Sequence, residues 1–179
     1  MTSETAFIHA FTVVVGLEGG FTDSPADPGN WTGGRCGAGR CAGTKFGISA
    51  AAYPATEIAA LTLDEAQVIY RRDYWDRTQG DWLPAPLALL VFDAAVNNGV
   101  ARAVGWLQQA VGVSADGVIG PETMAAVAAR AGDGAVLLAE YQARRLAFMA
   151  GLPTWRVFGL GWARRLCRLP FEAMRMGGV

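Results

Sequence analysis

The chain has 179 residues, of which 52% are hydrophobic and 17% are charged, and its formal net charge is −1. This composition excludes a disordered chain, and the length suits one domain or one domain with a small appended module. The longest apolar runs, such as residues 86–96, are much shorter than the roughly 20 residues needed to span a bilayer.

The first predicted element is a helix over residues 7–21 that ends at a Gly-Gly pair. Ile8, Phe11 and Val15 follow helical spacing, and Glu18 lies three positions further along the same stripe. Burial and the negative end of the helix dipole both disfavour a charged carboxylate there, so Glu18 is predicted to hold its proton. A protonated carboxyl is what the general acid of glycoside cleavage requires. The alternative is an exposed helix-ending Glu beside a turn.

Residues 22–43 are rich in Gly, Asp, Pro and Asn, and they are predicted to form loops and turns. The best strand candidate follows at residues 44–49, so we expect a small hairpin before the next helix. Long polar loops in a compact chain are more often functional than idle. The loop and hairpin are therefore expected to form one wall of a cleft.

The cysteines and the single histidine do not indicate a metal site. Cys36 and Cys41 are too loosely spaced for a zinc-binding pair, Cys167 is remote, and His9 lies within the first helix. No nucleophile motif accompanies His9, which makes a Ser-His-Asp or Cys-His mechanism improbable. We expect no metal and no cofactor. Cys36 and Cys41 either form a small disulfide in an oxidising compartment or stay free thiols.

The second predicted helix starts at a capping box formed by Thr62 and Glu65. Its end combines aromatic and polar residues, as sugar-binding walls often do, and Tyr74 is a candidate there. The alternative is ordinary core packing, which we favour for Tyr70.

Residues 87–96 are apolar all round and predict a buried central helix. Asp93 and Asn97 lie four positions apart on it, and buried polar groups need partners. We expect a structural role for Asp93, while Asn97 is a candidate for either structure or substrate binding. Gly99 is expected to end this helix.

Further helices are predicted in the last part of the chain. Pro121 is placed to begin one of them after the Asp116-Gly117 turn. Asp133 is expected to cap the next, which runs to about Ala150. The apolar residues of the final helix have helical spacing and should pack back on the body: Trp155, Phe158, Trp162, Leu166 and Leu169.

Charge is distributed unevenly along the chain. Residues 140–179 contain seven Arg and two Glu, a net charge of +5, which leaves −6 for the rest. A basic amphipathic end suits an anionic surface such as a cell envelope, and the alternative is a solvated helix face. Because the body is acidic and no recognised module is present, we do not expect nucleic-acid binding.

Several short motifs occur in a fixed order along the chain. They are Leu17-Glu18-Gly19-Gly20-Phe21, Asp27-Pro28-Gly29, Thr44-Lys45-Phe46-Gly47-Ile48-Ser49 and Tyr70-Arg71-Arg72-Asp73-Tyr74-Trp75. In this order and spacing they resemble family 108 glycoside hydrolases, the phage and bacterial N-acetylmuramidases of the lysozyme-like superfamily. Residues 106–127 are similar to the peptidoglycan-binding region that follows the catalytic part in this family, and we expect Gln108 and Glu122 to be exposed polar residues there.

The resemblance implies an α+β, mainly α, lysozyme-like fold with a small hairpin flap beside the catalytic helix. Residues 1–100 would form the catalytic region, and residues 101–179 a helical peptidoglycan-binding region packed on it. Glu18 would be the general acid, and Asp27, with Thr44, would position water. Asp23 competes with Asp27 for this role, and Asp27 is also interpretable as a turn residue. The candidates for substrate binding are Phe46, Tyr74, Asn97, Asp116 and Gly117.

The activity implied is hydrolysis of the β-1,4 bond between N-acetylmuramic acid and N-acetylglucosamine in peptidoglycan. One alternative is a lytic transglycosylase, which forms a 1,6-anhydro ring instead of admitting water. Another is a non-catalytic peptidoglycan-binding or tail-structural protein. The N-terminus has no basic region typical of a signal peptide, so we expect a protein that is made in the cytoplasm and released to the wall by a holin-type route or lysis. We expect it to be a monomer.

Overall fold

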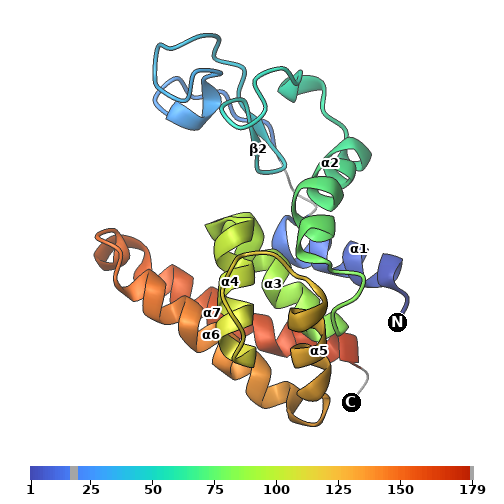
Figure 1. Ribbon diagram of the computed structural model, residues 1–179. Helices are drawn as coiled ribbons and strands as arrows, with labels where there is room; N and C mark the ends of the chain where they lie inside the picture. Colours follow the sequence, from blue (N-terminus) through green and yellow to red (C-terminus); the bar gives the residue numbers. More distant parts are fainter. Residues whose placement is uncertain (17–19, 178–179) are drawn as a thin grey trace. The chain divides into compact units, whose positions relative to one another are not determined.

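The computed structural model describes residues 1–16 and 20–177, and Figure 1 colours them along the chain. Helices prevail, and a two-stranded antiparallel sheet accompanies them. The predicted α+β, mainly α fold class is therefore confirmed. Within these residues, no helix has both the length and the apolar character needed to cross a bilayer.

The chain divides into two compact units. One unit combines Met1–Ala10 with Arg72–Val179, and the other consists of Phe11–Arg71. Helix α1 (Ser3–Val14) contributes its first part to one unit and its last part to the other.

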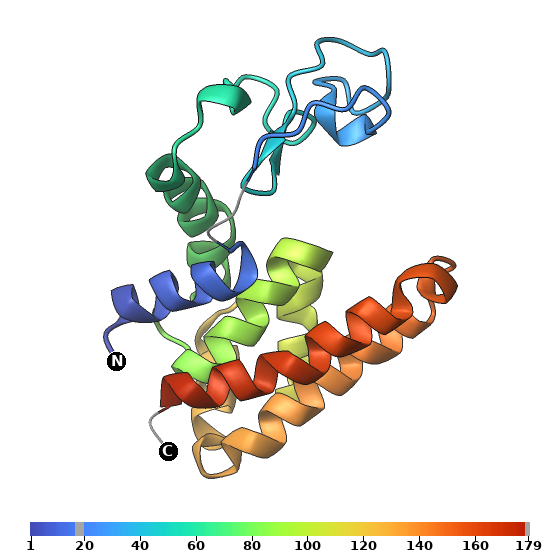
Figure 2. The same cartoon turned by 180° about the vertical axis from the view of Figure 1, so that it is seen from behind.

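Helix α3 (Ala85–Asn98) is the centre of the larger unit, and every residue of 87–95 is buried. It packs against α4 (Val100–Val111), α6 (Gly134–Ala150) and α7 (Trp155–Gly177), as Figures 1 and 2 show from opposite sides. Fully burying one large apolar side chain stabilises a fold by roughly 1.5–3 kcal/mol. Among the described helices, α3 contributes the most residues to the core. The predicted buried central helix is confirmed.

Local signals define both ends of α3. Pro84 lies at the N-cap and Pro86 in the first turn, where the missing amide proton costs no helical hydrogen bond. Gly99 ends the helix with a φ of +88°, a conformation that residues with a Cβ rarely adopt. The predicted end at Gly99 is confirmed.

An aromatic cluster fixes the first part of α1 in this unit. The ring of Phe7 makes edge contacts with Trp75 and Phe92, at centroid distances of 5.5 and 6.1 Å. Trp75 is fully buried at the end of a π-helical turn (Arg71–Trp75), and its Nε1 donates to Asp81 at 2.7 Å. Such edge-to-face pairs contribute about 0.5–1.5 kcal/mol beyond their buried area.

The remaining helices of this unit are short or lie towards the C-terminus. The turn η4 (Asp76–Thr78) follows the π-helix, and α5 (Pro121–Ala129) begins at Pro121 as predicted. Asp133 precedes α6, but the prediction that it caps this helix is wrong, because its side chain makes no capping hydrogen bond. Its carboxylate instead lies 3.8 Å from Nε of Arg130.

Helix α7 packs back on the body as predicted, mainly against α3 and α6. Leu166 and Leu169 are buried on its inner side. Phe158 does not follow them, because 53% of it is exposed. The stripe predicted to face inward is therefore buried only in the second half of the helix.

The smaller unit contains loops, a hairpin and α2 (Leu63–Tyr70). Thr62 and Glu65 form the predicted capping box, with the Glu65 carboxylate 2.8 Å from the Thr62 amide nitrogen. Residues 22–43 are irregular apart from the 3₁₀ turn η1 (Pro28–Asn30), and η2 (Ile58–Ala60) precedes α2.

The predicted hairpin is present, although the run expected to be a single strand is two. Strand β1 (Thr44–Lys45) pairs antiparallel with β2 (Ile48–Ser49), in the register Thr44 to Ser49. Phe46 and Gly47 form the turn between them, with φ values of 51° and 74°. Two central residues with positive φ are typical of tight hairpin turns, because their twist matches that of the strands.

The predicted first helix is wrong at its end and in its buried face. Helix α1 ends at Val14, and Gly16 takes a φ of +78°, so the helix stops at the first glycine available and not at the later Gly-Gly pair. The buried stripe is Ala6, Phe7, Ala10 and Phe11, whereas Ile8 is 37% exposed. Glu18 lies outside the described residues, and the helix whose spacing was used to place it ends at Val14.

Candidate active site

Asp27 begins the turn η1, and its side chain has a clear local partner. Its Oδ1 accepts a hydrogen bond from the backbone amide of Gly29 at 2.8 Å, and Pro28 occupies the first position of the turn. This is the way Asx residues hold tight turns. The side chain remains exposed, so the carboxylate is accessible to water.

Thr44, at the start of β1, is joined to two neighbouring segments. Its hydroxyl donates to the side-chain Oδ1 of Asn30 at 2.7 Å. Its backbone exchanges hydrogen bonds with Thr22 at 2.9 and 2.7 Å. The hydroxyl proton is thus engaged, while the oxygen lone pairs remain able to accept a hydrogen bond.

Asn30 connects Thr44 to the turn that begins with Asp27, and the sequence analysis missed it. It is fully buried, and its Nδ2 donates to the carbonyl of Ser24 at 3.1 Å. Its own carbonyl accepts from Ala42 and Gly43. Buried amides need such partners, but a Pro-Gly-Asn run looks like any exposed turn in sequence, so no signal marked Asn30.

The rival carboxylate and the cysteines lie in the same loop region. Asp23 is exposed, and its backbone carbonyl accepts a hydrogen bond from the thiol of Cys41 at 3.3 Å. Cys36 and Cys41 are free thiols, so the alternative of a disulfide between them is not realised.

Phe46 lies at the hairpin turn and is half-buried. The hydroxyl of Tyr70 donates to its carbonyl at 2.9 Å, which ties the turn to the end of α2. Tyr70 is itself buried, in agreement with the core role favoured for it. The ammonium of Lys45 lies 5.5 Å from the centre of the Phe46 ring, within cation–π range.

Tyr74 lies in the π-helical turn and is half-buried, as is Asp73 before it, whereas Trp75 after it is fully buried. Its carbonyl accepts a hydrogen bond from the hydroxyl of Thr78 at 2.9 Å. Trp75, the other aromatic residue at this end of the predicted helix, belongs to the core.

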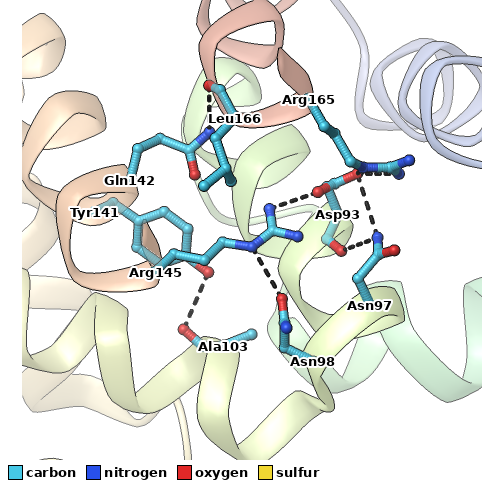
Figure 3. Close-up of polar contacts among 9 residues, drawn as sticks. All are labelled: Asp93, Asn97, Asn98, Ala103, Tyr141, Gln142, Arg145, Arg165 and Leu166. Carbon is cyan, nitrogen blue, oxygen red and sulfur yellow. Dashed lines mark hydrogen bonds and ion pairs between the residues drawn. The ribbon is translucent and has the colours of Figure 1, made fainter. Parts of the chain in front are cut away.

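Asn97 is bound to a buried ion cluster around Asp93, shown in Figure 3. Asp93 is fully buried and accepts hydrogen bonds from Arg145, at 2.5 Å, and from Nε of Arg165, at 2.8 Å. Asn97 is exposed, and its Nδ2 donates to the carbonyl of Asp93 at 2.8 Å. The geometry gives Asp93 the structural role expected for it, and Asn97 keeps one side towards solvent.

The same cluster fixes α6 to α3 and α4. Nε of the buried Arg145 donates to Oδ1 of Asn98 at 2.9 Å, and the hydroxyl of Tyr141 donates to the carbonyl of Ala103 at 3.2 Å (Figure 3). Burial raises the pKa of Tyr141 far above its usual range, Arg145 opposes this, and the charge of Asp93 adds to it. Tyr141 therefore stays a neutral hydrogen-bond donor at any physiological pH.

Asp116 and Gly117 come together at a third polar centre, the side chain of Gln108. Nε2 of Gln108 donates to Oδ1 of Asp116 at 2.7 Å and to the carbonyl of Val118 at 3.0 Å. Its Oε1 accepts from the amide of Gly117 at 2.9 Å. Gln108 is only 1% exposed, so our inclusion of it among exposed polar residues is wrong. Its buried amide finds its hydrogen-bond partners in the turn, although Asp116 and Val118 are themselves exposed.

Two family models match consecutive parts of the chain. A family model described as Glycosyl hydrolase 108 matches residues 11–99, and one described as Predicted Peptidoglycan domain matches residues 102–167. The solved structure of Brucella abortus SagA is 37% identical, with a TM-score of 0.80, and the alignment covers 98% of each chain. The chain belongs to glycosyl hydrolase family 108. No curated protein matches it.

Membership of family 108 makes this protein a glycoside hydrolase that acts on peptidoglycan, an enzyme of the muramidase type. The lysozyme-like fold implied by the sequence agrees with the likeness to SagA over the whole chain. Peptidoglycan is the partner, and the peptidoglycan domain indicates action at the cell wall.

The family 108 enzyme also has an apolar cavity of about 530 Å³ in its larger unit, lined by the start of α3, by α5 and α6, and by the end of α7. Pro86, Leu87 and Leu137 belong to its carbon-rich lining. Glycans carry many hydroxyl groups that need hydrogen-bond partners, so such a lining does not suit them. Among the described residues, no group of three or more His, Cys, Asp or Glu lies together as a metal site would require.

The Gln108 centre leads to a prediction about pH. The hydrogen bond from Gln108, and secondarily that from the Val118 amide, lowers the pKa of Asp116 below its ordinary 3.8. The stabilising contribution of the charged form is therefore fully present above about pH 4 and is lost as the pH falls through the pKa of the folded state. Asp116→Asn should lower the urea midpoint at pH 7, and this difference from the wild type should shrink on acidification.

A second variant tests whether Gln108 causes the lowered pKa of Asp116. In Gln108→Met the pKa of Asp116, followed by NMR titration of its carboxyl carbon, should return towards 3.8. An unchanged pKa in this variant would show that Gln108 is not what holds the charged form.

Proposed function

We propose that this enzyme is an N-acetylmuramidase that hydrolyses the β-1,4 bond between N-acetylmuramic acid and N-acetylglucosamine. The observation that carries the proposal is the succession of the two matched regions, a glycosyl hydrolase over residues 11–99 and a peptidoglycan domain over residues 102–167. Residues 1–100 form the catalytic region in this proposal, and residues 101–179 hold the polymer.

In the proposed mechanism, Glu18 protonates the glycosidic oxygen, and a second carboxylate positions the attacking water. Asp27 suits this second role because its carboxylate is exposed and is held at one oxygen by the Gly29 amide. Thr44 supports the same water through its free lone pairs, since its hydroxyl proton is engaged by Asn30. Asn30 thus positions both groups without taking part in the chemistry.

Glycan contacts are proposed for residues that present a side towards solvent. Phe46 and Tyr74 are half-buried aromatics, which suits stacking on a sugar face, and Asn97 has an exposed amide. Asp116 and Gly117 would present the outer edge of their turn to the glycan or the peptide stem, while Gln108 holds the inner side.

Mass spectrometry of digested sacculi tests the reaction. Hydrolysis is expected to give reducing N-acetylmuramic acid ends. Products ending in a 1,6-anhydro ring would identify a lytic transglycosylase instead, and uncut sacculi would indicate a purely binding or structural protein.

The choice between the two loop carboxylates leads to a further prediction. Asp27→Asn should slow hydrolysis by about ten- to a hundredfold, less than loss of the acid, because a residue that only orients water contributes less than the proton donor. Asp23→Asn serves as the matched control and should stay near the wild-type rate. If Asp23→Asn is the more damaging of the two, the second carboxylate has been misassigned.

We also propose where the enzyme acts and how it reaches the wall. An endolysin-like monomer, bacteriolytic and of phage or bacterial origin, would reach the wall after holin-type release or lysis. The basic final helix would hold it near an anionic part of the envelope. The structure limits which arginines serve this, because Arg145 and Arg165 are bound to Asp93.

A further inference from the structure

The outward side of α7 combines exposed apolar and cationic residues. Val157, Leu160 and Phe171 are 74%, 67% and 65% exposed. Arg164, Arg168 and Arg175 are exposed as well. Their spacing of three, four and seven positions places all six on one face of the helix, which we call the outer face. At 1.5 Å per residue the face extends for about 27 Å.

The internal packing of the protein does not use these side chains. Leu166, Leu169, Ala173 and Met176 are the buried residues on the opposite side, and the chain folds back on α3 and α6 through them. Figures 1 and 2 show the turn that joins α6 and α7 extending beyond the other helices of this unit. Exposed apolar residues are ordinary when they are scattered singly. Three of them on one helical face form a patch of the kind that marks an interaction site.

The charge of this surface is of one sign. Residues 141–171 contain no Asp or Glu. Glu172 is the acid on the helix near the outer face, and its side chain is only 17% exposed, 3.4 Å from both Arg168 and Arg175. The two arginines keep about three quarters of their side-chain surface exposed. The outer face is therefore positive as well as apolar.

These properties together favour one kind of occupant. Helices that lie in a membrane interface have apolar side chains on the face that meets the acyl chains and arginines that reach the headgroups. A glycan strand would use the arginines but leave Val157, Leu160 and Phe171 without apolar contact. A second copy of the chain would bring like charges together, which opposes association.

We propose that the outer face of α7 binds the surface of an anionic phospholipid bilayer, with the helix lying along the membrane plane. This rests on the proposed function in one respect, since it specifies the anionic part of the envelope to which the enzyme is held. The arginines attract the phospholipid headgroups, and Leu160 and Phe171 enter the boundary between headgroups and acyl chains. The enzyme would thereby work on the peptidoglycan next to a membrane.

Co-sedimentation of the full chain with vesicles tests the proposal. Binding is expected to vesicles of mixed phosphatidylglycerol and phosphatidylcholine, and at least about tenfold more weakly to phosphatidylcholine alone. Leu160→Ser with Phe171→Ser should weaken binding to the anionic vesicles about tenfold or more. The matched control is Val68→Ser with Val136→Ser, two exposed valines on α2 and α6, which should bind like the wild type.

The charge is tested separately by Arg164→Gln with Arg168→Gln, which should weaken binding at low salt and reduce its dependence on salt. Equal binding to neutral and anionic vesicles, or equal binding by the apolar variant and its control, would overturn the proposal. So would binding to purified sacculi without binding to vesicles, or self-association in place of binding.

Hydrolysis of soluble muropeptide oligomers separates this proposal from the proposed function. The apolar variant, checked for unchanged thermal unfolding, should cleave them at the wild-type rate. Vesicle binding without hydrolysis would contradict the proposed muramidase activity and support the membrane-binding proposal. Hydrolysis without vesicle binding would support the muramidase activity and contradict the membrane-binding proposal.

Discussion

Glu18→Gln is expected to leave a folded protein whose rate of peptidoglycan hydrolysis is at least about a hundredfold lower. General acid catalysis contributes about 10²–10⁴-fold, and the amide keeps the size of the side chain but cannot give up a proton to the leaving oxygen. The measurement is the release of reducing ends from purified sacculi, with circular dichroism to establish that the variant is folded.

The matched control is Glu140→Gln, the same chemical change at a half-exposed carboxylate on α6 that lies 3.8 Å from Arg144. It should keep the wild-type rate. Retention of more than about a tenth of the rate by Glu18→Gln would correspond to less than about 1.4 kcal/mol of barrier, too little for the proton donor. Glu18 would then not be the acid.

Asp93→Asn is expected to destabilise the fold by about 3–5 kcal/mol, the usual cost of breaking a buried ion pair by removing one partner. The variant is nearly the same shape, but it leaves Arg145, which is fully buried, and Arg165 without their carboxylate. Urea unfolding, followed by tryptophan fluorescence, measures the change.

An exposed ion pair provides the comparison. Arg40 and Glu57 lie 3.4 Å apart with more than half of each side chain exposed, so Glu57→Gln should change the free energy of unfolding by less than about 1 kcal/mol. If Asp93→Asn costs no more than Glu57→Gln, the buried cluster does not hold α3 to α6 and α7 as its contacts suggest.

Elements with strong local signals were predictable from the sequence. Helix α3 shows this best, because its residues are apolar on all sides and prolines and Gly99 mark its ends. The capping box at Thr62 and the start of α5 at Pro121 are equally local. These signals act over three or four residues, which is the range that a sequence pattern records.

Positions that depend on distant partners were not predictable. Gln108 and Asn30 are buried polar residues whose partners lie in neighbouring loops, and nothing around either of them indicates burial. Arg145 and Arg165 follow Asp93 by 52 and 72 positions, so the charge count placed them in a basic tail. Where two stop signals compete, as at Gly16 and the Gly-Gly pair, local pattern does not decide between them.

Helix α3 and the helices that cover it belong to different matched regions. Its residues 87–95 belong to the glycosyl hydrolase match, yet the helices that cover them, α4, α6 and most of α7, belong to the following match. A recombination event at residue 100 would expose the buried residues 87–95 of α3 to water and separate Asp93 from both of its arginines. The two matched regions therefore depend on each other for folding, and we expect that replacing either of them with an unrelated region would unfold the other.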